Sequence, residues 1–176
     1  IKCDVALICA VKNELEALEY FFKNTNSQIT NFKKDSTDYY RVDLKLRDKK
    51  IKLVYAQQKE MGMAAASTLS LNLIHHFQPK YLIMVGIAAG IGSEKNPGDI
   101  IVATEVWNYS SGKYVTGNNG EIVFSPDPKY ISLDSEIESI LKRDYTQQLF
   151  NIKKAWRHQS DGDRQGIERA PDERPS

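Results

Sequence analysis

Residues 81–92, read from Tyr81 to Gly92 as YLIMVGIAAGIG, join an apolar run to a run of glycine and alanine. An apolar run without alternation predicts a strand covered on both faces, as in the middle of a parallel sheet. The small residues that follow let the backbone approach another group closely. Ligands of open α/β sheets bind outside the carboxyl ends of the strands. This segment is therefore either the floor of a ligand site or only a tight, buried turn.

The chain before this segment predicts alternating strands and helices, which indicates an α/β fold. The expected elements are a buried strand over residues 3–11, a helix over 13–22 with Asn13 as a candidate N-cap, a loop over 24–38, a hairpin formed by 39–46 and 51–56, and an alanine-rich helix over 62–77 that Pro79 ends.

The chain after this segment is less regular. The expected elements are a turn over residues 96–99, a strand over 100–103 followed by 105–107, a long loop over 109–128 with a strand at 122–124, and a helix over 133–150. Residues 157–176 contain only Ile167 and Ala170 as apolar residues, so we predict a disordered tail. We expect one domain over residues 1–156 and this polar tail over 157–176.

Composition excludes several classes of protein. Lys and Arg number 24 against 23 Asp and Glu, a formal net charge of +1, so neither nucleic acid nor an anionic membrane is expected as partner. No apolar run is long enough to span a bilayer, and Ile1 begins directly in a strand-like pattern without a signal peptide.

Cys3 and Cys9 would lie roughly 20 Å apart along a strand, too far to bridge. We therefore expect both cysteines to be small hydrophobic core residues, and the protein to be cytoplasmic, in a reducing compartment.

Glu14 is the leading candidate for chemistry, because it follows the first strand at the edge where ligands bind. A carboxylate in the first turn of a helix is favoured by the helix dipole alone, and it can equally serve as a general base or hold a water. Glu16 and Glu19 fit a solvated helix face. His75 and His76 close a helix and fit structural or surface positions.

Known nucleotide-binding and hydrolase motifs are absent from the sequence. The glycine segment reads G-I-A-A-G-I-G rather than G-x-G-x-x-G, and there is no G-x-x-x-x-G-K-[ST] loop and no G-x-S-x-G elbow. No Cys or carboxylate stands at ligand spacing around the histidines. We therefore expect neither a metal nor a cofactor.

Three segments together resemble the nucleoside phosphorylase and nucleosidase superfamily, and in particular its methylthioadenosine/S-adenosylhomocysteine nucleosidase branch. They are Val5–Leu18 (VALICAVKNELEAL), Met61–Ala66 (MGMAAA), and Val85–Gly90 (VGIAAG) with Pro97–Val102 (PGDIIV). The resemblance implies a three-layer α/β/α fold with a mixed, largely parallel central sheet, incomplete at the C-terminus.

The resemblance also implies roles for individual residues. Glu14 matches the glutamate that activates the attacking water, and Met61 matches an apolar residue over the sugar and its 5′ substituent. Ala88 and Ala89 match small residues that border the ribose and base. The implied substrate-binding set is Ala10, Met61, Gly86, Ile87, Ala88, Ala89 and Gly90.

The sequence departs from the family in three places. Ile87 stands where many nucleosidases have Ser. Lys12-Asn13-Glu14 replaces the region where phosphorylases carry a phosphate-binding Arg, which favours hydrolysis over phosphorolysis. Neither the Met-Glu pair that binds the sugar hydroxyls nor the Asp that protonates the purine is found. Ser160-Asp161 resembles the Asp motif only superficially, because no buried strand precedes it.

The segment Trp107–Lys113 resembles a branch of the superfamily found in bacterial signalling and defence proteins. We expect a purine nucleoside or nucleotide N-glycosidase that releases the base by hydrolysis, with a small molecule as its partner and, by resemblance, a homo-oligomeric state. The alternatives are a phosphate-dependent phosphorylase and a non-catalytic nucleoside-sensing module.

Overall fold

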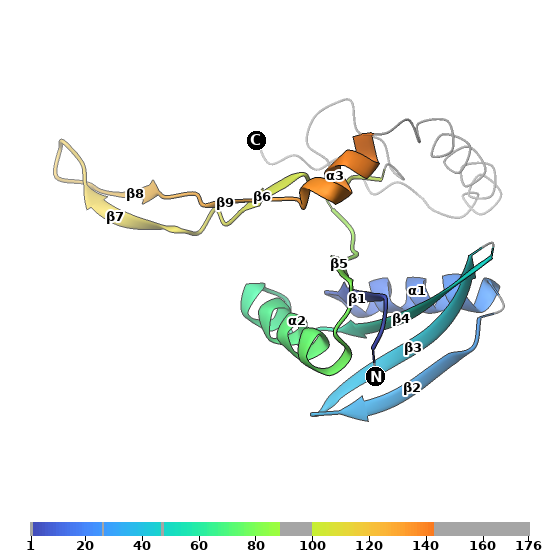
Figure 1. Cartoon of the computed structure of the whole chain (residues 1–176). Helices are drawn as coiled ribbons and strands as arrows, with labels where there is room; N and C mark the ends of the chain where they lie inside the picture. Colours follow the sequence, from blue (N-terminus) through green and yellow to red (C-terminus); the bar gives the residue numbers. More distant parts are fainter. Residues whose placement is uncertain (1, 26, 47, 89–99, 143–176) are drawn as a thin grey trace, which may run out of the picture. The chain divides into compact units, whose positions relative to one another are not determined.

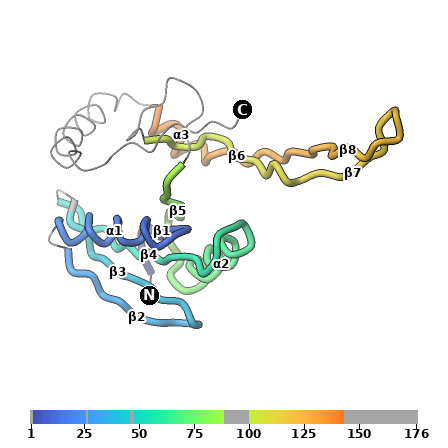
Figure 2. The backbone as a smooth tube through the Cα atoms, turned by 180° about the vertical axis from the view of Figure 1, so that it is seen from behind, coloured from blue at the N-terminus to red at the C-terminus, as the bar shows by residue number. Residues whose placement is uncertain are grey.

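The computed structural model describes residues 2–25, 27–46, 48–88 and 100–142. It divides into two compact units, residues 1–89 and residues 90–176. Figure 1 labels the elements, and Figure 2 follows the same backbone from behind.

The first unit is a five-stranded mixed sheet with two helices (Figure 1). β1 pairs in parallel with β4 and with β5, whereas β2, β3 and β4 form an antiparallel meander. The spatial order is β2 (Ile29–Lys34), β3 (Thr37–Leu46), β4 (Lys49–Gln57), β1 (Val5–Cys9) and β5 (Tyr81–Met84). The helices are α1 (Lys12–Asn24) and α2 (Met63–Phe77). The expected α/β fold with a mixed sheet is confirmed.

The two helices cover opposite faces of the sheet, because successive side chains of a strand point to opposite sides. On β1, Ala6 and Ile8 pack in a cluster with three residues of α2: Leu69, Leu73 and Phe77. Leu7 and Cys9, the residues between and after them, pack in a second cluster with Leu15 and Phe22 of α1. The sheet is thus the middle of three layers and has a hydrophobic core on each side.

The start of α1 differs from the sequence expectation. Asn13 lies inside the helix, and Val11 occupies the N-cap position. Valine has no side-chain acceptor, so its own side chain cannot cap the helix. Instead Glu14, the third helical residue, accepts a hydrogen bond from the Val11 backbone N–H, which is one half of a capping box.

The expected loop over residues 24–38 is also wrong in part, because it contains β2. β2 is an edge strand whose only partner in the described sheet is β3, and it is rich in exposed polar residues. Only Ile29 and Phe32 are packed against the cores, Ile29 against the cluster on the α1 side and Phe32 against the cluster on the α2 side, so neither face of β2 shows a repeated apolar pattern. Asp35 and Ser36, both with positive φ, form the two-residue turn into β3.

In the described sheet, β5 is an edge strand and not the central strand that its sequence predicts. It pairs there with β1 alone. Its residues Leu82, Ile83 and Met84 are exposed. A continuous apolar run does not distinguish a central strand from an edge strand, and here β1 holds the buried position between β4 and β5. Cys3 and Cys9 are buried and unbridged, as expected.

The second unit consists of two short antiparallel ribbons and a helix. β6 (Glu105–Trp107) pairs with β9 (Tyr130–Ser132), β7 (Gly112–Thr116) pairs with β8 (Ile122–Pro126), and α3 covers Ser135–Lys142. Residues 100–103, expected as a strand, have no ladder partner in the described chain and are not a strand, whereas β7 was not expected.

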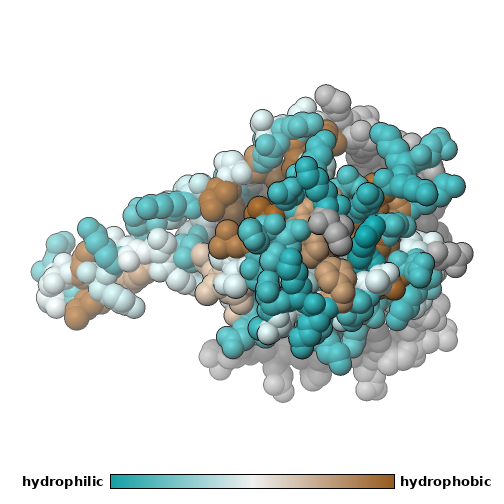
Figure 3. Space-filling view, turned by 60° about the horizontal axis from the view of Figure 1, so that its bottom comes forward, coloured by the Kyte–Doolittle hydropathy of each residue, from teal (hydrophilic) through white to brown (hydrophobic). Residues whose placement is uncertain are grey.

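The described strands of the second unit keep large hydrophobic side chains at the surface. Tyr114, Ile122 and Tyr130 are exposed, for example. Figure 3 shows hydrophobic side chains among hydrophilic ones on one face of the molecule. None of the helices in the described ranges has the length and hydrophobicity of a membrane span.

Several expectations fall outside the described residues. They are the turn over residues 96–99, the part of the helix beyond Lys142, Asp161 and the tail over 157–176.

Candidate functional site

The carboxyl ends of three neighbouring strands meet at one edge of the sheet, because β4, β1 and β5 run in parallel. In their register Cys9 lies opposite Gln57, and Ile8 lies opposite Met84. The segments that leave these strands carry the residues singled out from the sequence. Glu14 follows β1, and the glycine segment follows β5.

Glu14 sends its carboxylate from the first turn of α1 to the segment after β5. Its Oε1 atom accepts a hydrogen bond of 2.9 Å from the backbone N–H of Ile87. Its Oε2 atom accepts bonds of 2.7 Å from Ala10 and 3.1 Å from Val11, again from backbone N–H groups. Three fixed amide donors therefore hold one partly buried carboxylate across two segments that are 73 residues apart in the chain.

These contacts set the charge of the site. Burial raises the pKa of Glu14, and the three backbone hydrogen bonds, from Ile87, Val11 and Ala10, lower it by more, so the net shift is downward. Glu14 is therefore ionised at neutral pH. Burial, with the Glu14 charge as a second cause, raises the pKa of the neighbouring Cys9 thiol to about 11, so Cys9 is a neutral core residue.

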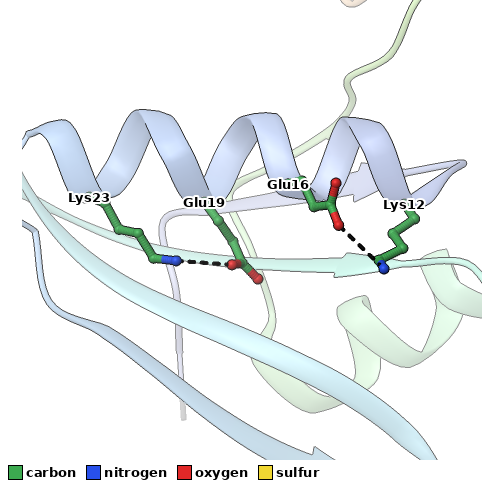
Figure 4. A network of polar contacts seen from close by, with 4 residues as sticks. All are labelled: Lys12, Glu16, Glu19 and Lys23. Carbon is green, nitrogen blue, oxygen red and sulfur yellow. Dashed lines mark hydrogen bonds and ion pairs between the residues drawn. The ribbon is translucent and has the colours of Figure 1, made fainter.

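The other acidic residues of α1 behave differently. Glu16 pairs with Lys12 at 3.4 Å and Glu19 pairs with Lys23 at 3.4 Å, each four residues apart on the helix (Figure 4). Such exposed pairs contribute only about 0.3–0.5 kcal/mol each. Glu16 lies on the solvated helix face expected from the sequence, whereas the side chain of Glu19 is only 26% exposed. Glu14 alone of these three acids hydrogen-bonds the segment after β5.

The structure brings together four of the residues named from the sequence: Ala10, Glu14, Gly86 and Ile87. The side chain of Ile87 is 84% exposed. Ala88 is also exposed, and Met61 follows β4 with a side chain that is 77% exposed. Ala89 and Gly90 lie outside the described residues.

A cavity of about 380 Å³ adjoins the segment that carries Met61. It is large enough for a small molecule. Its lining comes from the turn before β3, the end of β4, the segment after it and the first half of α2: Asp35, Thr37, Gln57, Gln58, Lys59, Glu60, Ala64, Ala65, Thr68, Leu69 and Asn72. Gln58 is buried, and its Oε1 atom has no hydrogen-bond partner in the described structure.

Sequence reasoning missed this cavity and the backbone donors around Glu14. Residues 57–61 read only as a short loop from the sequence, and nothing in the residue types shows that Gln58 is buried. The N–H of Val11 could have been found, since a glutamate at the third position of a helix is half of a capping box. Among the described residues, no group of three or more His, Cys, Asp or Glu is placed to hold a metal.

Glu14 and the small-residue segment meet at the carboxyl ends of parallel strands, the position where ligands of open α/β proteins generally bind. The chain belongs to the phosphorylase superfamily, whose family model matches residues 4–157. That match spans both structural units and includes every candidate site residue.

Relatives in sequence include proteins with and without an assigned activity. The uncharacterized protein y4jS of Sinorhizobium fredii is 30% identical over 141 residues, which are 80% of this chain and 34% of that protein. The ATP nucleosidase Cap17 of Escherichia coli is 23% identical over 129 residues, which are 73% of this chain and 25% of that protein. The chain thus spans about a third or less of the length of these relatives.

Solved structures show the same fold at low identity. Futalosine hydrolase of Helicobacter pylori matches with a TM-score of 0.60 at 13% identity, covering 83% of this chain and 59% of that one. The Helicobacter pylori MTAN matches with a TM-score of 0.56 at 14% identity, covering 82% and 61%. At this identity the likeness establishes the fold alone.

Proposed function

We propose that the chain contributes to an N-glycosidase site that releases a purine base from a nucleoside or nucleotide by hydrolysis. The observation that carries the proposal is the carboxylate of Glu14, which accepts hydrogen bonds from three backbone amides at the carboxyl ends of the parallel strands and whose pKa these bonds lower. By resemblance to nucleosidases, Glu14 would correspond to their water-activating glutamate, which supports the proposal.

The chemistry suits an ionised carboxylate. The bond between the sugar C1′ and the base nitrogen breaks, and the base leaves with the bonding electron pair and takes up a proton. Positive charge develops on the sugar, and a water adds its oxygen to C1′ while losing a proton. Glu14 would hold that water, accept its proton and stabilise the positive charge through its own negative charge.

The names of the relatives support hydrolysis over phosphorolysis. One sequence relative is named an ATP nucleosidase, and one structural relative is named a hydrolase. In this chain Lys12, Asn13 and Glu14 replace the region where phosphorylases of the superfamily bind phosphate. A nucleoside triphosphate is thus among the substrates to test, together with adenosine and methylthioadenosine.

The experiment is a base-release assay on the full-length protein, with each candidate substrate in phosphate-free buffer and with added phosphate. We expect free base and free sugar product without phosphate, detected by chromatography. Turnover only with phosphate would replace the proposal with phosphorolysis. Calorimetric binding of a nucleoside without base release over hours would favour the non-catalytic module.

A further inference from the structure

Gly86 occupies a position where a side chain is excluded by the Glu14 carboxylate. A Cβ atom built on Gly86 would lie 2.6 Å from Oε1 of Glu14, 3.1 Å from its Cδ and 3.4 Å from its Oε2. These are the three nearest atoms, and all of them belong to Glu14. The space beside Gly86 is therefore filled by the carboxylate itself.

The backbone of Gly86 does not explain the glycine. Among the described glycines, Gly62 and Gly120 have positive φ, and Gly86 does not. An alanine could adopt its backbone conformation without left-handed strain. What position 86 requires is the absence of a side chain.

The Ile87 amide lies one residue further on and donates to the same oxygen that a Cβ at position 86 would meet. Gly86 leaves room for Oε1 of Glu14, and the backbone N–H of Ile87 donates a hydrogen bond to that oxygen. The other oxygen is fixed by Ala10 and Val11. Both ends of the carboxylate are thereby set by backbone atoms at the carboxyl ends of β1 and β5.

We propose that Gly86 and the Ile87 amide are positioning residues, which seat the Glu14 carboxylate rather than contact the substrate. This inference rests on the proposed function and gives Gly86 a role different from the substrate contact that the family resemblance implies. The substrate would meet Glu14, and Gly86 would act through it.

The substitution Gly86→Ala adds one methyl group and tests whether Gly86 positions Glu14 or has only a structural role. In Gly86→Ala, the atom that must move is the end of a flexible side chain, so the fold can persist. Oε1 would have to retreat by about 0.8 Å, from 2.6 to the 3.4 Å of ordinary contact. A misplacement of about 1 Å can cost about 10²-fold in rate. We expect such a loss in kcat, with a smaller change in KM.

Gly117 offers a matched control. A Cβ there would lie 2.5 Å from Oε1 of Glu121, the same kind of clash with a glutamate carboxylate, but in the β7–β8 hairpin. Gly117→Ala should leave kcat within about twofold of wild type. Equal losses in the two variants would overturn the proposal.

A double variant distinguishes positioning from substrate contact. Asp in place of Glu14 shortens the side chain by one methylene and withdraws the carboxylate from position 86. If Gly86 acts through Glu14, Gly86→Ala should lower kcat/KM little further in the Glu14→Asp background. If Gly86 touches the substrate, the full loss of about 10²-fold would recur there and refute the positioning role.

NMR supplies a readout that does not depend on activity. In the wild type, the Ile87 amide proton should shift with pH as the Glu14 carboxylate titrates. That titration should disappear in Gly86→Ala and in Glu14→Asp, and persist in Gly117→Ala. An Ile87 amide that titrates unchanged in Gly86→Ala or in Glu14→Asp would contradict the proposal. If the wild-type protein shows this titration but releases no base, the proposed function is refuted, whereas the positioning of Glu14 by Gly86 and Ile87 still holds.

Discussion

The two structural units place hydrophobic residues in opposite ways. In the first unit, the sheet has a packed core on each face, and β1 is buried along almost its whole length. In the second, the described strands are two-stranded ribbons with exposed hydrophobic side chains. Two-stranded ribbons alone are marginally stable in water. The position of the Glu14 carboxylate is therefore fixed by the packed first unit, which contains Glu14 and both segments that donate hydrogen bonds to it.

The largest effect on stability is expected in the core between α2 and the sheet. Leu73 of α2 is 0% exposed, and Leu73→Ala should lower the free energy of unfolding by about 2–5 kcal/mol through lost burial and the cavity left behind. Leu71→Ala, on the exposed side of the same helix, is the matched control, with an expected change within about 0.5 kcal/mol. Denaturant unfolding of both variants tests this, and equal losses would contradict the assigned layers.

Cys9 reports on the second core, which lies on the other face of β1. Its pKa, raised to about 11 by burial and by the charge of Glu14, leaves about 10⁻³ of the thiol ionised at pH 8. We expect alkylation of Cys9 at pH 8 to be at least about 100-fold slower in the native protein than in denaturant. Mass spectrometry of the labelled peptide measures this, and rapid labelling of the native thiol would show that the core opens at β1.

The ionisation of Glu14 links the site to stability with a defined sign. Its folded pKa lies below the unfolded value, so its contribution is present above the unfolded pKa, about 4.3, and is lost as pH falls through the folded value. The stability difference between wild type and Glu14→Gln should therefore be larger at pH 7 than at pH 3. Unfolding curves at both pH values measure it, and a difference that grows toward pH 3 would reverse the assigned shift.

The smallest effect is expected in the ribbons. Ile122 of β8 is 76% exposed, so Ile122→Ala should change the free energy of unfolding by no more than about 0.5 kcal/mol. A loss comparable to that of Leu73→Ala would show that a contact in the intact protein buries this side chain, and the contrast between the units would fail.

The sequence predicted those parts of the fold that depend on strong local patterns. Residues 3–11 and 62–77 carry enough apolar residues to mark a strand and a helix, and both are present. β2 was missed because an edge strand needs few apolar residues. β5 lies at the edge of the described sheet and not at its centre, because strand order depends on long-range pairing, which an apolar run does not encode.

The site was predictable only in its topology. Parallel strands bring the segments after them to one edge, which explains why Glu14 and the glycine segment meet. The donors to Glu14 are backbone N–H groups, whose direction depends on the folded chain and not on the side chains of Ala10, Val11 or Ile87. Gly86 could be recognised as a close approach, but not as an approach to Glu14.

The central claim is that Glu14 is the catalytic carboxylate, and one comparison tests it most directly. Glu14→Gln keeps the size of the side chain and removes its charge, whereas Glu16→Gln makes the same change on the exposed face of α1. With base release as the readout, we predict that Glu14→Gln lowers kcat by about 10²–10⁴-fold and that Glu16→Gln leaves it near wild type. Base release at wild-type speed by Glu14→Gln would contradict the account.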